Sequence, residues 1–139
     1  MLSSLDCAQA EENMDREDIE RLEKVTGKLE GLHKEISLLA KKSSTDGLNT
    51  FKLKLLNGAL EAANGILGDE HQPVEGFSQF DADDVPSNSD ATVVLAIYLE
   101  EMERYRSDLL TVISGGSYWY AFEDGTKLRA APPKRLRGK

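Results

Sequence analysis

The carboxylates of Asp81, Asp83 and Asp84 lie close together in one stretch of the chain and could act as metal ligands. Hard cations such as calcium are bound by several oxygen ligands from one loop. A calcium loop of the EF-hand type also needs a glycine at its turn and a closing glutamate, whereas Val85 and Pro86 follow here. The pattern therefore predicts no metal site, and we expect no cofactor.

Histidine, cysteine and tyrosine offer little other chemistry. His71 has no second histidine or cysteine nearby in sequence, as a local zinc site would need, and the single Cys7 has no cysteine partner. Tyr98 and Tyr105 lie on an apolar seam, where tyrosine usually packs in the core with its hydroxyl hydrogen-bonded. Phosphate-binding glycine loops, serine elbows and paired histidines at helical spacing are absent from the sequence. We therefore expect no catalytic residue and a protein that is not an enzyme.

Three stretches repeat apolar residues every three or four positions, which is the spacing of a buried helix face. They predict helices over about 13–42, 46–67 and 90–114. The first and third seams have the spacing of coiled-coil heptads and consist of Leu22, Val25, Leu29, Leu32, Ile36 and Leu39, and of Ala91, Leu95, Tyr98, Met102, Tyr105, Leu109 and Val112. The second stretch has a wider apolar face, which includes Leu48, Phe51, Leu55, Leu56 and Leu60 and favours a buried central helix.

The helical spacing of apolar residues ends at Gly115 and Gly116, and a different pattern follows. Aspartate followed by glycine at 124–125, between two extended runs, is a strong hairpin signal and predicts a β-hairpin over 118–129. Tyr118, Tyr120 and Phe122 would share one face, with Trp119 on the other. A lone hairpin is marginal in water, so we expect one face to pack on the helices or on a second copy.

Residues 68–89 have no periodic pattern and are rich in acidic residues. A long segment without regular structure in a small domain tends to mark function or disorder. Phe77 and Phe80 lie within it, and two readings are open. The phenylalanines either pin the loop onto the helices or form an acidic, aromatic recognition segment for a basic partner.

The charge of the chain is unevenly distributed around a net value of −8. Residues 126–139 contain no acid, so the rest of the chain is more acidic than the net charge implies. An acidic body is repelled by a phosphate backbone, and nucleic acid could be bound only through this basic C-terminal end. A block of like charges at a chain terminus is also typical of a tail that is simply exposed to solvent.

These patterns predict a mainly α protein, a three-helix antiparallel bundle with a small C-terminal β-hairpin and a basic tail. We expect an N-terminal arm over 1–12, one helical domain over 13–129 and the tail over 130–139. The longest apolar run, Val93 to Ile97, is far too short to span a membrane, and a single cysteine suits a reducing compartment. We therefore expect no membrane contact and a cytoplasmic location.

The expected function is that of a non-enzymatic protein–protein interaction module, an adaptor, inhibitor or regulator that forms a homodimer through its helical seams. The expected partner-binding residues are Trp119, Tyr118, Tyr120, Phe122, Phe77, Phe80, Asp81, Asp83 and Asp84. One alternative is a nucleic-acid-associated regulator that uses the aromatic hairpin and the cations Lys127, Arg129, Lys134, Arg135 and Arg137. Another is an acidic mimic that occupies a basic site on a target protein.

Overall fold

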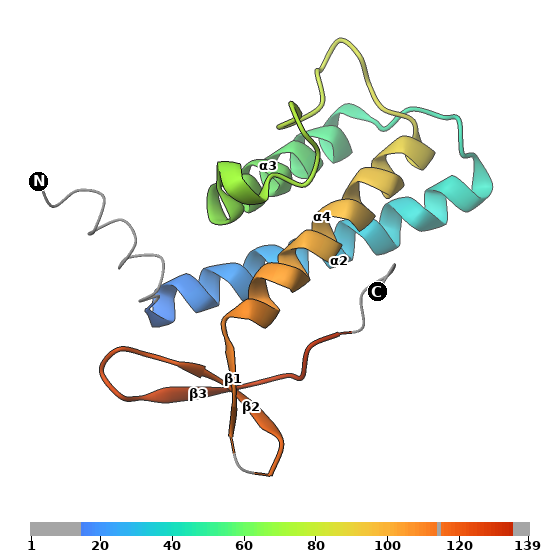
Figure 1. Ribbon diagram of the computed structural model, residues 1–139. Coiled ribbons are helices and arrows are strands. Elements are labelled where there is room, and N and C mark those ends of the chain that lie inside the picture. The colour runs from blue at the N-terminus through green and yellow to red at the C-terminus, as the bar shows by residue number, and fades with distance from the viewer. Residues whose placement is uncertain (1–14, 114, 135–139) are drawn as a thin grey trace, which may run out of the picture.

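The computed structural model describes residues 15–113 and 115–134, and this part of the chain is mainly helical. In Figure 1 the helices lie above a small sheet. The helices are α2 (Arg16–Lys42), α3 (Thr50–Leu67) and α4 (Asn88–Asp108), with a short 3₁₀ turn, η1 (Asp69–His71), after α3. The strands are β1 (Leu110–Ile113), β2 (Ser117–Ala121) and β3 (Lys127–Ala130).

Side-chain caps set where the helices begin. Asp15 and Asp18 form a reciprocal capping box at the start of α2, and the Ser87 hydroxyl accepts a hydrogen bond from the backbone N–H of Asp90 at the start of α4. The start of α3 is later than the expected residue 46. Its cap is Asn49, whose side chain accepts from Lys52 N–H at 2.7 Å. Residues just before this cap instead form an isolated antiparallel bridge between Gly47 and Ser87.

The long connection over residues 68–87 sets the relative direction of the helices. It runs back along α3, because Asn64 donates to the carbonyl of Ser78 and Asn57 to that of Phe80. Consequently α4 begins beside the end of α2, where Asn88 donates to the carbonyl of Ser43 at 2.9 Å. In Figure 1, α3 and α4 run in the same general direction and α2 runs opposite to both.

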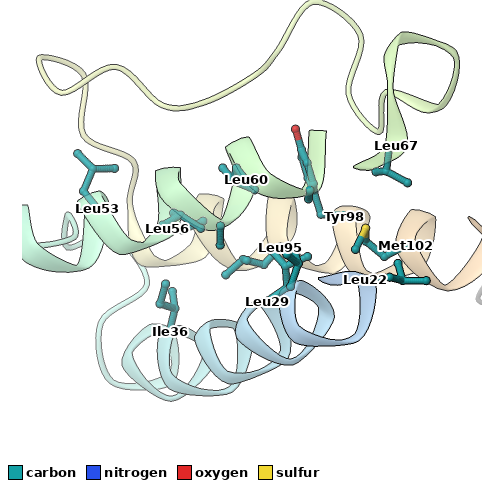
Figure 2. Close-up of a cluster of buried hydrophobic side chains, with 14 of the residues drawn as sticks. Leu22, Leu29, Ile36, Leu53, Leu56, Leu60, Leu67, Leu95, Tyr98 and Met102 are labelled. Carbon is teal, nitrogen blue, oxygen red and sulfur yellow. The ribbon is translucent and has the colours of Figure 1, made fainter. Parts of the chain in front are cut away.

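The core lies between the three helices (Figure 2). Each helix contributes buried side chains to it, and these include the seam residues Leu22, Val25, Leu29 and Ile36 of α2 and Ala91, Leu95, Tyr98 and Met102 of α4. Ten of these residues are labelled in the close-up: Leu22, Leu29, Ile36, Leu53, Leu56, Leu60, Leu67, Leu95, Tyr98 and Met102. Tyr98 points its ring between α3 and α4, and its hydroxyl donates to Asn64 Oδ1 at 2.9 Å. Burial raises the pKa of Tyr98, and the hydrogen bond to Asn64 opposes that effect.

The predicted hairpin is present as β2 and β3, which pair antiparallel, and β1 adds a third strand that the sequence did not predict. The expected third helix was to reach about residue 114, but α4 ends at Asp108, and Leu110–Ile113 pairs with β2 as an antiparallel strand. The strand order is β1-β2-β3, and Asp124–Gly125 lies in the connection between β2 and β3. Gly115 and Gly116 both have positive φ in the preceding connection, a backbone conformation that favours glycine.

Two asparagines on α3 hold the acidic connection in place. The Asn57 amide accepts from Phe80 N–H and donates to Phe80 C=O, both at 2.9 Å. The rings of Phe77 and Phe80 meet edge to face with centroids 5.0 Å apart, and both pack against the core. In this structure the two phenylalanines therefore pin the loop onto the helices.

We expect Asn57→Ala to lower the free energy of unfolding by about 1–3 kcal/mol, because it leaves two partly buried groups of Phe80 without their partner. Chemical denaturation measures the loss, and hydrogen exchange should speed up at the Phe80 amide. Glu61→Ala, at an exposed position of the same helix, is the matched control and should change neither quantity. Unchanged exchange at Phe80 in Asn57→Ala would contradict this anchoring role.

Candidate functional site

The apolar stripe of α3 is wider than the core that covers it. Leu53, Leu56 and Leu60 are buried, whereas Phe51 is 69% exposed and Leu55, one turn further on, is 48% exposed. The sequence places Phe51 and Leu55 on a buried face, and the structure corrects this placement. Phe51 and Leu55 are here called the α3 outer face. Their exposure leaves a large aromatic and a large aliphatic side chain adjacent on one helix.

Further exposed apolar residues occur on the other elements. Val93 and Ile97 lie one turn apart on α4, and Val112 on β1 is 60% exposed. Leu38 and Val85 are also exposed, at separate places in the chain. Scattered single exposures of this kind are normal on soluble proteins, so the paired positions on helices carry more information than the isolated ones.

The expected partner-binding aromatics of the C-terminal region lie on opposite faces of the sheet. Tyr120 is only 1% exposed and packs in the core, and Phe122 is partly buried beneath the guanidinium of Arg16, 4.9 Å from the ring centroid. Trp119 lies on the other face, where Arg129 stacks 5.6 Å from its ring. Of this group, Tyr118 and Trp119 are half-buried, and the structure uses Tyr120 as a core residue.

A buried ion pair joins α4 to the sheet and to the segment that follows it. Arg106 donates from Nε to Glu103 Oε1 and from Nη2 to Glu103 Oε2, both at 2.9 Å. Its remaining donors reach the Tyr120 hydroxyl and the carbonyls of Ala131 and Pro132, at 3.0–3.4 Å. All five N–H donors of the guanidinium thus have acceptors. We call Glu103, Arg106 and Tyr120 the Arg106 cluster.

The chain beyond β3 is held by the same cluster. Glu103 Oε2 accepts from Lys134 N–H at 2.8 Å, and the Lys134 ammonium pairs with Glu30 of α2 at 2.8 Å. The second contact joins two exposed side chains, so it adds little to stability. The arrangement fits a structural role, because every charge in the Arg106 cluster is engaged within the chain and the cluster holds no reactive nucleophile and base.

Protonation of Glu103 should lower the stability of the fold at acid pH. Burial by itself raises the pKa of Glu103, but the hydrogen bonds from Arg106 and from Lys134 N–H outweigh it and hold that pKa below its ordinary value of 4.5. The hydrogen bond with Glu103 raises the pKa of Arg106, against the opposing effect of burial. A carboxyl whose pKa is lower in the folded state stabilises the fold above its unfolded pKa.

We therefore expect the contribution of Glu103 to be complete near neutral pH and to disappear as the pH falls below 4.5 through the folded pKa. Denaturation of the wild type and of Glu103→Gln at a series of pH values measures it. The difference in unfolding free energy between the two proteins should shrink toward acid pH. A difference that stays constant or grows there would contradict the lowered pKa.

The acidic residues of the connection are exposed and hydrogen-bonded mainly to their own loop. Asp81 Oδ1 accepts from Asp83 N–H at 2.9 Å, and Asp84 N–H donates to the Asp81 carbonyl. Among residues 15–113 and 115–134, no group of three histidine, cysteine, aspartate or glutamate side chains is placed to hold a metal ion. The possible contact of these aspartates with a basic partner stays a prediction.

Two of the expected nucleic-acid-binding cations already have partners within the chain. Arg129 stacks on Trp119, and Lys134 pairs with Glu30. Lys127 is exposed on β3, while Arg135 and Arg137 lie outside the described residues. The expected arm over 1–12 and Cys7 lie outside them as well.

Two open clefts flank the helices, and their linings are polar and apolar in similar measure. One, of about 640 Å³, lies between the start of α2 and the β2–β3 connection and is lined by Asp15, Arg16, Phe122 and Asp124 among others. Hydrogen bonds from Thr126 lower the pKa of Asp124 at its rim. The other, of about 510 Å³, lies between the ends of α3 and α4, where His71 meets Tyr105 edge to face.

In the described part of the chain, none of the helices is both long and apolar enough to cross a membrane.

The α3 outer face and the Arg106 cluster were not predicted from the sequence, for different reasons. The width of the apolar stripe on α3 was visible in the sequence, but periodicity does not show how much of a stripe its neighbours will cover. Glu103 and Arg106 lie three residues apart on one helix, a spacing that already permits an ion pair. Their burial depends on residues far along the chain.

The scan against protein-family models found no match to this chain, and neither the search of curated proteins nor that of solved structures found one.

Proposed function

We propose that the protein is a non-enzymatic protein–protein interaction module whose partner-binding surface is the α3 outer face. The observation that carries the proposal is the exposure of Phe51 and Leu55, which lie outside the hydrophobic core cluster. Large aromatic side chains at the centre of an interface contribute a disproportionate share of binding energy. A partner with an apolar groove or helix face would remove both side chains from water.

The expected dimer through the helical seams is a less favourable form of this proposal. The seam residues Leu22, Leu29, Leu95 and Met102 are fully buried within the single chain. A second copy could reach them only if the core opened, at the cost of the packing that the seams now make. The exposed apolar residues offer surfaces that need no such opening.

The nucleic-acid alternative has weaker support. Because Arg129 and Lys134 are engaged, it depends chiefly on Lys127 and on the cations beyond residue 134. It predicts binding that weakens steeply with added salt and is lost when residues 130–139 are deleted. The acidic-mimic alternative predicts weaker binding when Asp81, Asp83 and Asp84 are neutralised.

The proposed function can be tested on the full chain in an extract of its native cells. We expect the wild-type chain to migrate in a complex of larger mass, and Phe51→Ser to migrate with a smaller mass because the partner is lost. Glu61→Ser is the matched control, since Glu61 is exposed on the same helix, and it should migrate like the wild type. A Phe51→Ser protein that keeps the wild-type complex would overturn the proposal.

A further inference from the structure

Strand β1 is the first strand of the sheet and presents an open edge. It pairs with β2 along its whole length, and no other strand or bridge in the described residues pairs with its second edge. Thr111 and Val112 in its middle are exposed. An edge of this kind offers unpaired N–H and C=O groups, which are satisfied best by another extended strand.

The opposite edge of the same sheet carries the features that discourage strand pairing. Lys127 and Arg129 are exposed charged residues on β3, and Pro132 and Pro133 follow it closely. Charged side chains and prolines are the common means by which proteins block an exposed edge. In addition, the Arg106 cluster binds the chain after β3. Strand β1 has no charged residue and no proline, so only one of the two edges is blocked.

The charge pattern indicates which strand fits the open edge. Residues 109–122 form the longest run without a charged residue in a chain that is 30% charged. When a strand pairs antiparallel with the same strand of a second copy, a two-fold axis relates the two strands. A charged residue near that axis would lie close to the identical charge of the second copy. Two bodies that each carry a net charge of −8 also repel one another, and an uncharged contact avoids adding to that repulsion. The uncharged strand β1, which is rich in β-branched residues, therefore suits pairing with β1 of a second copy.

We propose that β1 pairs antiparallel with β1 of a second copy, around a two-fold axis at Thr111. Thr111 then lies opposite Thr111 of the second copy, and Val112 opposite Leu110 of the second copy. Leu110 and Val112 share the sheet face of Tyr120, so the pairing matches like faces and covers the exposed Val112. The two three-stranded sheets join into one of six strands. The inference goes beyond the proposed function, because it adds a second copy of the chain as a partner at a different surface.

Cross-linking tests the register of this pairing. In a full-length Cys7→Ser background, Thr111→Cys places two thiols opposite each other, with Cα atoms about 4.5–5.5 Å apart, within the range that a disulfide spans. We expect rapid, nearly complete formation of a covalent dimer under mild oxidation. Thr50→Cys, at another exposed threonine, at the start of α3, is the control and should cross-link only slowly. Equal rates at the two positions would overturn the proposal.

The mass of the protein in solution tests whether the β1 edge forms the dimer contact. We expect the wild-type chain to be a dimer and Val112→Lys, which introduces the kind of charge found on β3, to be a monomer with wild-type circular dichroism. Val93→Lys, at an exposed valine on α4, should stay dimeric. A wild-type monomer at all concentrations, an open-ended series of aggregates, or a dimer that survives Val112→Lys would each overturn the proposal. If Val112→Lys does not fold, the cross-linking rates of Thr111→Cys and Thr50→Cys decide whether β1 pairs with its copy.

Failure of this inference and failure of the proposed function give different results. Phe51→Ser should lose the heterologous complex and keep the dimer, while Val112→Lys should lose the dimer and keep the complex. A monomeric chain that still loses its complex on Phe51→Ser would refute the strand pairing alone.

Discussion

Replacement of Arg106 by methionine is expected to lower the free energy of unfolding by about 3–5 kcal/mol, because it leaves the buried carboxylate of Glu103 without its cation. The same change removes the donors that reach Tyr120 and the carbonyls of Ala131 and Pro132. Chemical denaturation near neutral pH measures the loss. Hydrogen exchange should also become faster in residues 127–134, because the cluster binds Ala131, Pro132 and Lys134 at the end of this segment.

Two further variants separate the effect of the charge of Arg106 from the effect of its hydrogen-bond geometry. Arg106→Lys keeps the charge but cannot reproduce the five-donor fork, so it should recover only part of the lost stability. The double variant Arg106→Met with Glu103→Met removes both charges and should be more stable than Arg106→Met alone. If Arg106→Met lost less than about 1 kcal/mol, the pair would behave like an exposed one, against its burial here.

Replacement of Leu60 by alanine should lower the free energy of unfolding by about 2–5 kcal/mol. Leu60 is fully buried between the helices, as Figure 2 shows, and truncation of its side chain removes apolar contacts and leaves a cavity. Thermal or urea denaturation measures the change. The broad range reflects how far the surrounding side chains can relax into the space.

Leu55→Ala is the matched control for this experiment. It is the same substitution on the same helix, but it removes a side chain that is already about half exposed. Its cost should be clearly smaller, within about 1 kcal/mol. Equal losses at positions 55 and 60 would mean that the α3 outer face belongs to the core and is not free for a partner.

The periodicity of apolar residues predicted the three helices of the described residues. The starts of α2 and α4 lie within three residues of the predicted positions 13 and 90, and short-range caps fix them, at Asp15 with Asp18 and at Ser87 with Asp90. The end of α4 was mispredicted because Leu109 and Val112 continue the helical spacing while Leu110–Ile113 also suits a strand. Pairing with β2 decided between these two structures, and pairing is a long-range contact that periodicity does not report.

The contacts that set the tertiary arrangement join residues far apart in the chain. Asn57 with Phe80, and Arg106 with Ala131, are each separated by more than twenty positions. Asparagine and arginine are ordinary surface residues in a sequence, so neither position suggested a buried or anchoring role. For the same reason the exposure of Phe51 could not be predicted, since it depends on which face of α3 its neighbours cover.

Site-specific photo-cross-linking tests the central claim, that the α3 outer face binds a protein partner, most directly. A photoreactive residue is placed at position 51 of the full chain in its native cells, and the mass of any covalent product is measured. The account predicts one discrete heterologous product, which is absent when the photoreactive residue is at position 61 and is reduced by Leu55→Ser. No product at position 51, or the same products from both positions, would contradict it.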